Sequence, residues 1–93
     1  MITAFVLIGA DRERIASLPD DLLNIKGVTE VYSVAGDYDL IAVVRVKDAD
    51  DLAKVVTEDF AKIRGISRTK TMIAFRCYTH YDLEHMFQIG FKN

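Results

Sequence analysis

The sequence predicts an α+β sandwich in which a four-stranded antiparallel sheet carries two helices on one face. Three observations predict it: two short apolar segments rich in β-branched residues, an amphipathic segment after each of them, and a repeat of this pattern at a constant offset. The 93 residues suffice for one such domain, and domains of this size often gain stability by oligomerisation.

The two apolar segments, Ile2 to Ile8 and Leu40 to Val46, are typical of buried strands. The second begins 38 residues after the first, and the same offset aligns Ile25–Thr29 with Ile63–Ser67. We therefore expect two consecutive copies of a strand–helix–strand unit.

The second helix is predicted to begin after Asp48, whose carboxylate can cap the first turn, and to end near Gly65. Its apolar residues recur at spacings of three and four and form one stripe: Leu52, Val55, Val56, Phe60 and Ile63. The first helix has a similar stripe but contains Pro19, which suits only a first turn. We expect loose turns from Asp11 and a firm helix only from about Leu18 to Asn24.

Glycine and aspartate between the two copies, in the segment Ala35–Asp39, favour a turn that joins two strands. The middle strands then form a hairpin, and the element order is βαββαβ. Right-handed crossovers place both helices on one face, which defines the ferredoxin-like fold. We assign this domain to residues 1–78 and a short C-terminal extension, packing on the core or on a neighbour, to residues 79–93.

The two faces of the predicted sheet differ in character. The face under the helices is wholly apolar and uses the even-numbered residues: Ile2, Ala4, Val6, Ile8, Leu40, Ala42, Val44 and Val46. The opposite face is also mostly apolar, where a solvated face would alternate with polar residues. If half of a face of roughly 400 Å² is apolar, covering it contributes on the order of 5 kcal/mol.

We therefore predict a dimer formed sheet to sheet. Its centre is expected to contain four residues: Phe5, Leu7, Ile41 and Val43. The alternative is that the chain covers this face with its own apolar tail: Leu83, Met86, Phe87, Ile89 and Phe91.

Composition excludes several classes of function. The formal net charge is -2, so no basic excess exists for phosphate contacts, and nucleic acid binding is not expected. The single cysteine, Cys77, allows no internal disulfide and gives no sign of an oxidising compartment. No apolar run reaches the ~18 residues of a membrane helix, and the first residues lack a basic leader. We expect a cytoplasmic protein that does not bind membranes.

Two segments resemble the Lrp/AsnC ligand-binding domain, also called the RAM domain. Val31–Leu40 is similar to the segment that joins the second and third strands of that family, where Gly, any residue, an aromatic residue and Asp recur. Gly65–Thr71 is similar to the start of its fourth strand, with a Thr-x-Thr pattern, and the resemblance covers most of Ile2 to Tyr78. The tail Tyr81–Phe87 resembles tails of stand-alone members. The chain departs from full-length members because its first strand begins at residue 2, so we expect a stand-alone member that lacks the helix-turn-helix.

The resemblance implies a sensor of amino acids or similar small metabolites that modulates transcription regulation or metabolism. It also implies homo-oligomers, with sheet-to-sheet dimers assembled further into rings and amino acids bound between the dimers. A full-length Lrp/AsnC-type regulator that co-assembles with the chain is the partner that it suggests. Direct DNA binding is not implied.

The candidate ligand site combines the glycine-bearing turn with polar residues of the fourth strand. Its predicted residues are Gly36, Asp37, Tyr38, Asp39, Thr69 and Thr71. Backbone N–H groups of the turn can bind the carboxylate of an amino acid, and the Asp39 carboxylate can pair with its ammonium group. Tyr38 offers an amphipathic wall, and the two threonines, in phase on one strand, can hydrogen-bond to either group. The alternative is ordinary turn chemistry followed by a solvated strand face.

Other polar residues have structural explanations. His80 and His85 are five apart, which suits neither a helical nor a strand metal site, so no metal is expected. Cys77 is expected to be a buried structural residue, since nothing in the sequence marks a catalytic thiol. The basic residues of the fourth strand could meet an anion or acidic residues of a neighbour, but we expect them to lie on a solvated edge: Arg68, Lys70 and Arg76.

We predict neither catalysis nor a cofactor. The competing hypothesis is a small dimeric ferredoxin-like enzyme, of the monooxygenase or isomerase type, with a cavity between sheet and helices. Such a site needs a polar residue in the core, and Thr3 and Arg45 are the candidates on the central strands.

RNA binding through the sheet would need aromatic residues on the middle strands, and Leu40–Val46 has none. A copper chaperone would need a CxxC pair, which a single cysteine cannot form.

Overall fold

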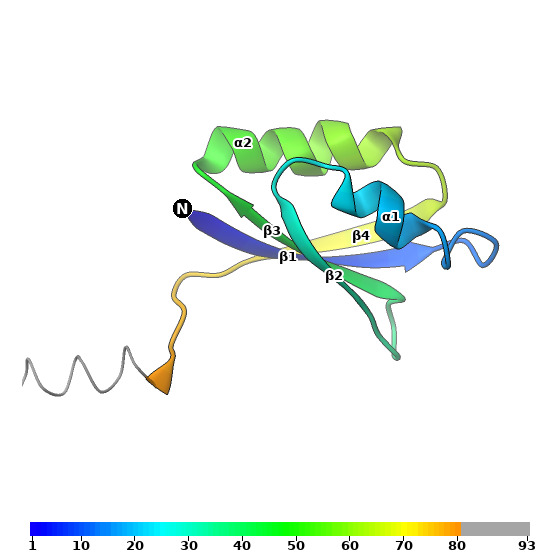
Figure 1. Cartoon of the computed structure of the whole chain (residues 1–93), viewed down its shortest axis with the longest axis horizontal. Helices are drawn as coiled ribbons and strands as arrows, with labels where there is room; N and C mark the ends of the chain where they lie inside the picture. The colour runs from blue at the N-terminus through cyan, green and yellow to red at the C-terminus, as the bar shows by residue number, and fades with distance from the viewer. Residues whose placement is uncertain (81–93) are drawn as a thin grey trace, which may run out of the picture.

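A computed structural model describes residues 1–80 of the chain (Figure 1). One antiparallel sheet, in the order β2-β3-β1-β4, contains the strands β1 (Ile2–Ala10), β2 (Val28–Ser33), β3 (Leu40–Val46) and β4 (Ile66–Ile73). The helices α1 (Leu18–Leu23) and α2 (Ala49–Lys54) lie on the same face of this sheet (Figure 1). The predicted ferredoxin-like βαββαβ sandwich is confirmed.

The helix α2 continues into a single π turn, η1 (Val55–Asp59), and a 3-10 turn, η2 (Phe60–Lys62). Asp48 caps α2 as predicted, because its Oδ1 accepts a 2.9 Å hydrogen bond from the Asp51 N–H. The π turn does not follow from the sequence pattern. It joins the Phe60 N–H to the Val55 carbonyl, five residues back, and both side chains are buried. An α-helical turn would place residues five apart on different faces.

The first helix is as short as Pro19 predicts. It has six residues, with the proline in its first turn and Asn24 at its C-cap. Before it, residues 11–17 form turns in which the Arg14 carbonyl accepts a hydrogen bond from the Leu18 N–H (2.9 Å). After each helical segment the chain turns at a glycine with positive φ, Gly27 (+103°) and Gly65 (+96°), so the internal repeat extends to backbone conformation.

The core lies between the sheet and the helices. The sheet contributes six residues that are at most 1% exposed: Ala4, Val6, Ile8, Leu40, Ala42 and Val44. The helical segments contribute five buried residues: Leu18, Leu22, Leu52, Val55 and Phe60. Val46 is buried too, and Ile2 is half-buried. The even-numbered set predicted for the core therefore faces the helices.

The opposite face of the sheet, here called the outer face, is partly open. Phe5 keeps 37% exposure, whereas Val43 keeps only 2% within a single chain. The cross-strand register adds Met72, opposite Phe5, and Tyr32, opposite Ile41, and both are about half exposed. The sheet-to-sheet dimer remains a prediction, and its available apolar surface extends beyond the predicted four residues to these two.

The segment after β4 corrects one prediction. Cys77, expected to be buried, is exposed because β4 ends at Ile73 and the chain then leaves the sheet (Figure 1). Phe75 is fully exposed in the same segment. The apolar tail from Leu83 to Phe91 lies outside the described residues. Within residues 1–80, no helix has the length and apolar character needed to cross a membrane.

Candidate functional site

The loop between β2 and β3 is anchored on the end of β1. The Val34 N–H donates to the Asp39 carbonyl (3.0 Å), and the Asp39 N–H donates to the Ile8 carbonyl (2.9 Å). Gly36 has φ +129°, a conformation that favours glycine, and a Cβ there would meet open space. The predicted glycine-bearing turn is therefore a solvent-facing loop with a fixed base.

Asp39 bonds to the backbone where the sheet is irregular. Its Oδ2 accepts a 2.8 Å hydrogen bond from the Ala10 N–H, next to the register shift between Gly9 and Ala10. Asp39 thus has a structural role that the sequence does not reveal. A carboxylate has a second oxygen, and no hydrogen bond to Oδ1 is found among residues 1–80. This oxygen can accept a hydrogen bond from an ammonium group.

Arg68 reaches the same loop from the other side of β1. Arg68 pairs with Gly9, and its Cζ lies 4.3 Å from the centre of the Tyr38 ring. Its Nη2 also donates to the Asp37 carbonyl. The Arg68 side chain can pass over β1 because residue 9 is a glycine. A Cβ at that position would lie 2.8 Å from the Arg68 Cγ. The signal in the sequence was a glycine at the end of an apolar strand, which often marks a close approach.

Thr69 and Thr71 do not point with Arg68. They pair across β1 with Ile8 and Val6, whose side chains face the helices, and directly opposed residues share a face. Thr69 lines a hollow of about 260 Å³ between η2 and β4. The structure therefore brings together four residues around the end of β1: Asp37, Tyr38, Asp39 and Arg68.

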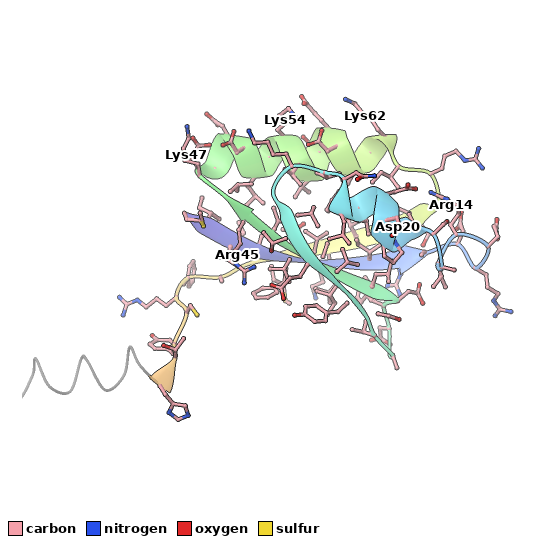
Figure 2. All side chains as sticks on the ribbon, in the orientation of Figure 1. Arg14, Asp20, Arg45, Lys47, Lys54 and Lys62 are labelled. Atoms are coloured by element: carbon pink, nitrogen blue, oxygen red, sulfur yellow. The ribbon has the colours of Figure 1, made fainter. Side chains whose placement is uncertain are left out.

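A polar cluster lies on the outer face. The Arg45 Nη1 donates to the Thr29 Oγ1 (2.7 Å) and to the Glu30 Oε1 (2.9 Å), and the Tyr32 hydroxyl donates to Glu30. The hydrogen bond from Tyr32, followed by that from Arg45, lowers the pKa of Glu30, while Glu30 raises the pKa of Tyr32. Figure 2 shows Arg45 on the side of the sheet away from the helices. Thr3 pairs with Arg45, so both residues considered for an enzymatic cavity lie on the outer face.

A groove of about 790 Å³ lies at the opposite end of β1. Its lining includes Lys26, Gly27, Val46, Lys47, Lys54 and Val55. Figure 2 shows Lys47 and Lys54 on the helix side, and the Lys54 Nζ lies 3.4 Å from the Asp59 Oδ1. The lining has no serine, cysteine or histidine, and none of the predicted site residues belongs to it.

Metal-ligating residues do not converge in the described part of the chain, where no group of three His, Cys, Asp or Glu side chains could hold an ion. His80 is exposed, and His85 lies outside the described residues. Around the end of β1 the described side chains offer the guanidinium of Arg68, the carboxylate of Asp39 and the ring of Tyr38.

The chain is a ferredoxin-like α+β domain with a glycine–aspartate loop fixed over the end of β1. Residues 3–82 match the model of the Lrp/AsnC ligand binding domain, and the chain belongs to this family. The resemblance seen in the sequence is confirmed.

Three relatives place the chain within the family. The uncharacterised HTH-type transcriptional regulator PH1916 of Pyrococcus horikoshii is 36% identical over 76 residues, which cover 78% of this chain and 51% of the regulator. The chain thus spans about half the length of the curated regulators that it matches. TTHA0845 from Thermus thermophilus is 46% identical, with a TM-score of 0.80, and covers 86% of this chain and 100% of its own. The feast or famine regulatory protein Rv3291c from M. tuberculosis, complexed with L-methionine, is 28% identical, with a TM-score of 0.71 over 86% of this chain and 54% of its own.

Proposed function

We propose that the chain is an amino-acid-sensing module that binds an amino acid or a similar small metabolite and so modulates transcription regulation or metabolism. The observation that carries this proposal is the Asp39 carboxylate, held beside the Gly36 loop by the Ala10 N–H (2.8 Å). Two facts support it: the family is a ligand-binding one, and the relative Rv3291c forms a complex with L-methionine.

The loop offers complementary groups for both ends of an amino acid. Asp39 pairs with the ammonium group through Oδ1, and N–H groups of the turn around Gly36 and Asp37 bind the carboxylate. Tyr38 forms a wall beside them. Because Thr69 and Thr71 point to the helix side, we assign them to the site only as contributions from a neighbouring subunit.

Assembly would couple binding to regulation. The outer face, with Phe5, Ile41 and Met72 partly exposed, supports a sheet-to-sheet dimer that assembles further into a homo-oligomer. A ligand bound between dimers stabilises the larger assembly and thereby biases co-assembly with full-length Lrp/AsnC-type regulators in the cytoplasm.

A binding role fits the polar groups better than catalysis does. The Arg45 guanidinium is engaged by Glu30 and Thr29 on the outer face, although the residue also lines one end of the groove beside α2. The curated relatives are transcriptional regulators. We therefore propose a module without enzymatic activity.

A thermal-shift screen of the chain against the twenty amino acids tests the proposal. An amino acid present at a hundredfold its dissociation constant should raise the free energy of unfolding by about 2.7 kcal/mol. If no amino acid raises the Tm while a small hydrophobic substrate is turned over, the sensing proposal is wrong and the enzyme is favoured.

Asp39→Asn removes the charge but keeps an oxygen that can accept the Ala10 N–H, so it should fold and lose the shift given by the amino acid. Asp39→Ala also leaves the Ala10 N–H without its acceptor, which costs about 1–3 kcal/mol of unfolding free energy. Comparing the two variants separates the effect of the Asp39 charge on amino acid binding from the effect of its hydrogen bond to Ala10 on stability. An undiminished shift in Asp39→Asn would remove the carboxylate charge from the site.

A further inference from the structure

Arg68 is held in one orientation by three separate contacts. Its guanidinium stacks on the Tyr38 ring (4.3 Å), its Nη2 donates to the Asp37 carbonyl, and its stem lies against Gly9. A long side chain usually loses conformational entropy when a ligand fixes it. Here the protein has fixed the side chain already, so a ligand would find the cation in place.

The guanidinium keeps donors for a further partner. It has five N–H donors, and the hydrogen bonds found in residues 1–80 use Nη2 alone. Arg68 is exposed, and the ion pairs in this part of the chain join other residues. A planar cation, fixed on one side and open on the other, matches the two oxygens of a carboxylate.

Arg68 and Asp39 approach the end of β1 from opposite sides. Arg68 lies on β4 beside Gly9, while Asp39 bonds to Ile8 and Ala10 from the β3 side. Neighbouring strands are ~4.8 Å apart, so the two Cα atoms are roughly 10 Å apart, and the Arg68 side chain crosses toward the loop. A cation and an anion that do not pair with each other thus face one small region, as a zwitterion requires.

We propose that Arg68 binds the α-carboxylate of the amino acid whose ammonium group binds Asp39. The site then selects α-amino acids with a free carboxylate over their α-amides. This inference rests on the proposed function and adds to it the residue that determines specificity for the carboxylate. The Tyr38 ring holds the guanidinium through a cation–π contact.

The test compares dissociation constants, measured by isothermal titration calorimetry, for two probes. One probe is the L-amino acid that raises the Tm most in the screen of the twenty, and the other is its α-amide. We expect the unaltered chain to bind the acid at least roughly tenfold more tightly than the amide. In Arg68→Met the affinity for the acid should fall roughly 10- to 100-fold with little change for the amide, so that discrimination is largely lost.

Two further variants sharpen the result. Lys70→Met is the matched control, because Lys70 is exposed, lies on the same face of β4 and has no hydrogen bond to the loop among the described residues. Gly9→Ala keeps the arginine but places a Cβ 2.8 Å from its Cγ, so the side chain must move. Gly9→Ala should lose discrimination as Arg68→Met does, and Lys70→Met should keep it. The Tm of each variant without amino acid reports folding separately.

The outcomes distinguish the possible errors. If Arg68→Met weakens acid and amide by the same factor, Arg68 only positions the loop and the inference is overturned. Unchanged discrimination in Arg68→Met overturns it as well, while leaving the amino-acid-sensing proposal intact. Failure of the unaltered chain to bind any amino acid contradicts that proposal, and the role of Arg68 falls with it.

Discussion

The two faces of the sheet are made by the same strands but differ in what covers them. On β1, Val6 is fully buried under the helices, while its neighbour Phe5 on the outer face keeps 37% exposure. On the outer face Tyr32 and Met72 are also about half exposed, and the polar cluster around Glu30 lies beside them. The helix side is therefore closed by the chain itself, whereas the outer face keeps apolar surface that a second copy can cover.

This difference assigns separate tasks to alternate residues of one strand. Residues that point to the helices supply the folding free energy, since burial of apolar area is its main favourable term. Residues that point outward contribute less within one chain and are available for assembly. Substitutions at neighbouring positions of a strand should then affect different measurements.

The largest effect is expected on the helix side. Ile8→Ala empties fully buried volume and should lower the free energy of unfolding by about 2–5 kcal/mol. Leu7→Ala, one residue earlier and only half-buried, should cost about 1 kcal/mol when the protein is dilute. Urea denaturation at low protein concentration measures both. Equal losses of unfolding free energy in the two variants would show that the outer face is as well buried as the core.

The next effect concerns association. Ile41→Asp places a charge on the central outer face and should raise the dissociation constant of the dimer by roughly a hundredfold or more, because an unpaired carboxylate is costly to bury. Sedimentation at micromolar concentration should then give the mass of a single chain. Ala53→Asp, on the exposed side of α2, is the control and should keep the larger mass. An unchanged mass for Ile41→Asp would argue against sheet-to-sheet pairing.

The fold follows from local patterns, which is why most of it could be predicted. Alternation along β1 and β3 predicts the core, Asp48 predicts the start of α2, and Pro19 predicts the short α1. The features that were missed have no local signal. The π turn inserts one residue between buried contacts, and Cys77 is exposed because β4 ends earlier than its alternation suggests.

The candidate site could be predicted only in part, because it is assembled by register. The loop from Gly36 to Asp39 is one contiguous segment, so its turn chemistry is visible in the sequence. Arg68 joins it only because β4 pairs with β1 in a register that places Arg68 opposite Gly9. The same pairing turns Thr69 to the helix side, since adjacent residues of a strand point to opposite faces.

The smallest expected effect lies in the polar cluster of the outer face. Hydrogen bonds from Tyr32 and then from Arg45 lower the pKa of Glu30 below its ordinary value of 4.5. Tyr32→Phe and Arg45→Met should therefore each raise this pKa toward 4.5, because each removes a hydrogen bond to the carboxylate. Because the folded-state pKa is depressed, the cluster contributes stability above pH 4.5 and loses it as the pH falls through the folded-state pKa. Carbon-detected NMR titration of the Glu30 carboxyl in the unaltered chain and in both variants measures the shift. If Tyr32→Phe leaves the Glu30 titration unchanged, the hydroxyl does not bond to this carboxylate in solution, and the cluster is held by Arg45 alone.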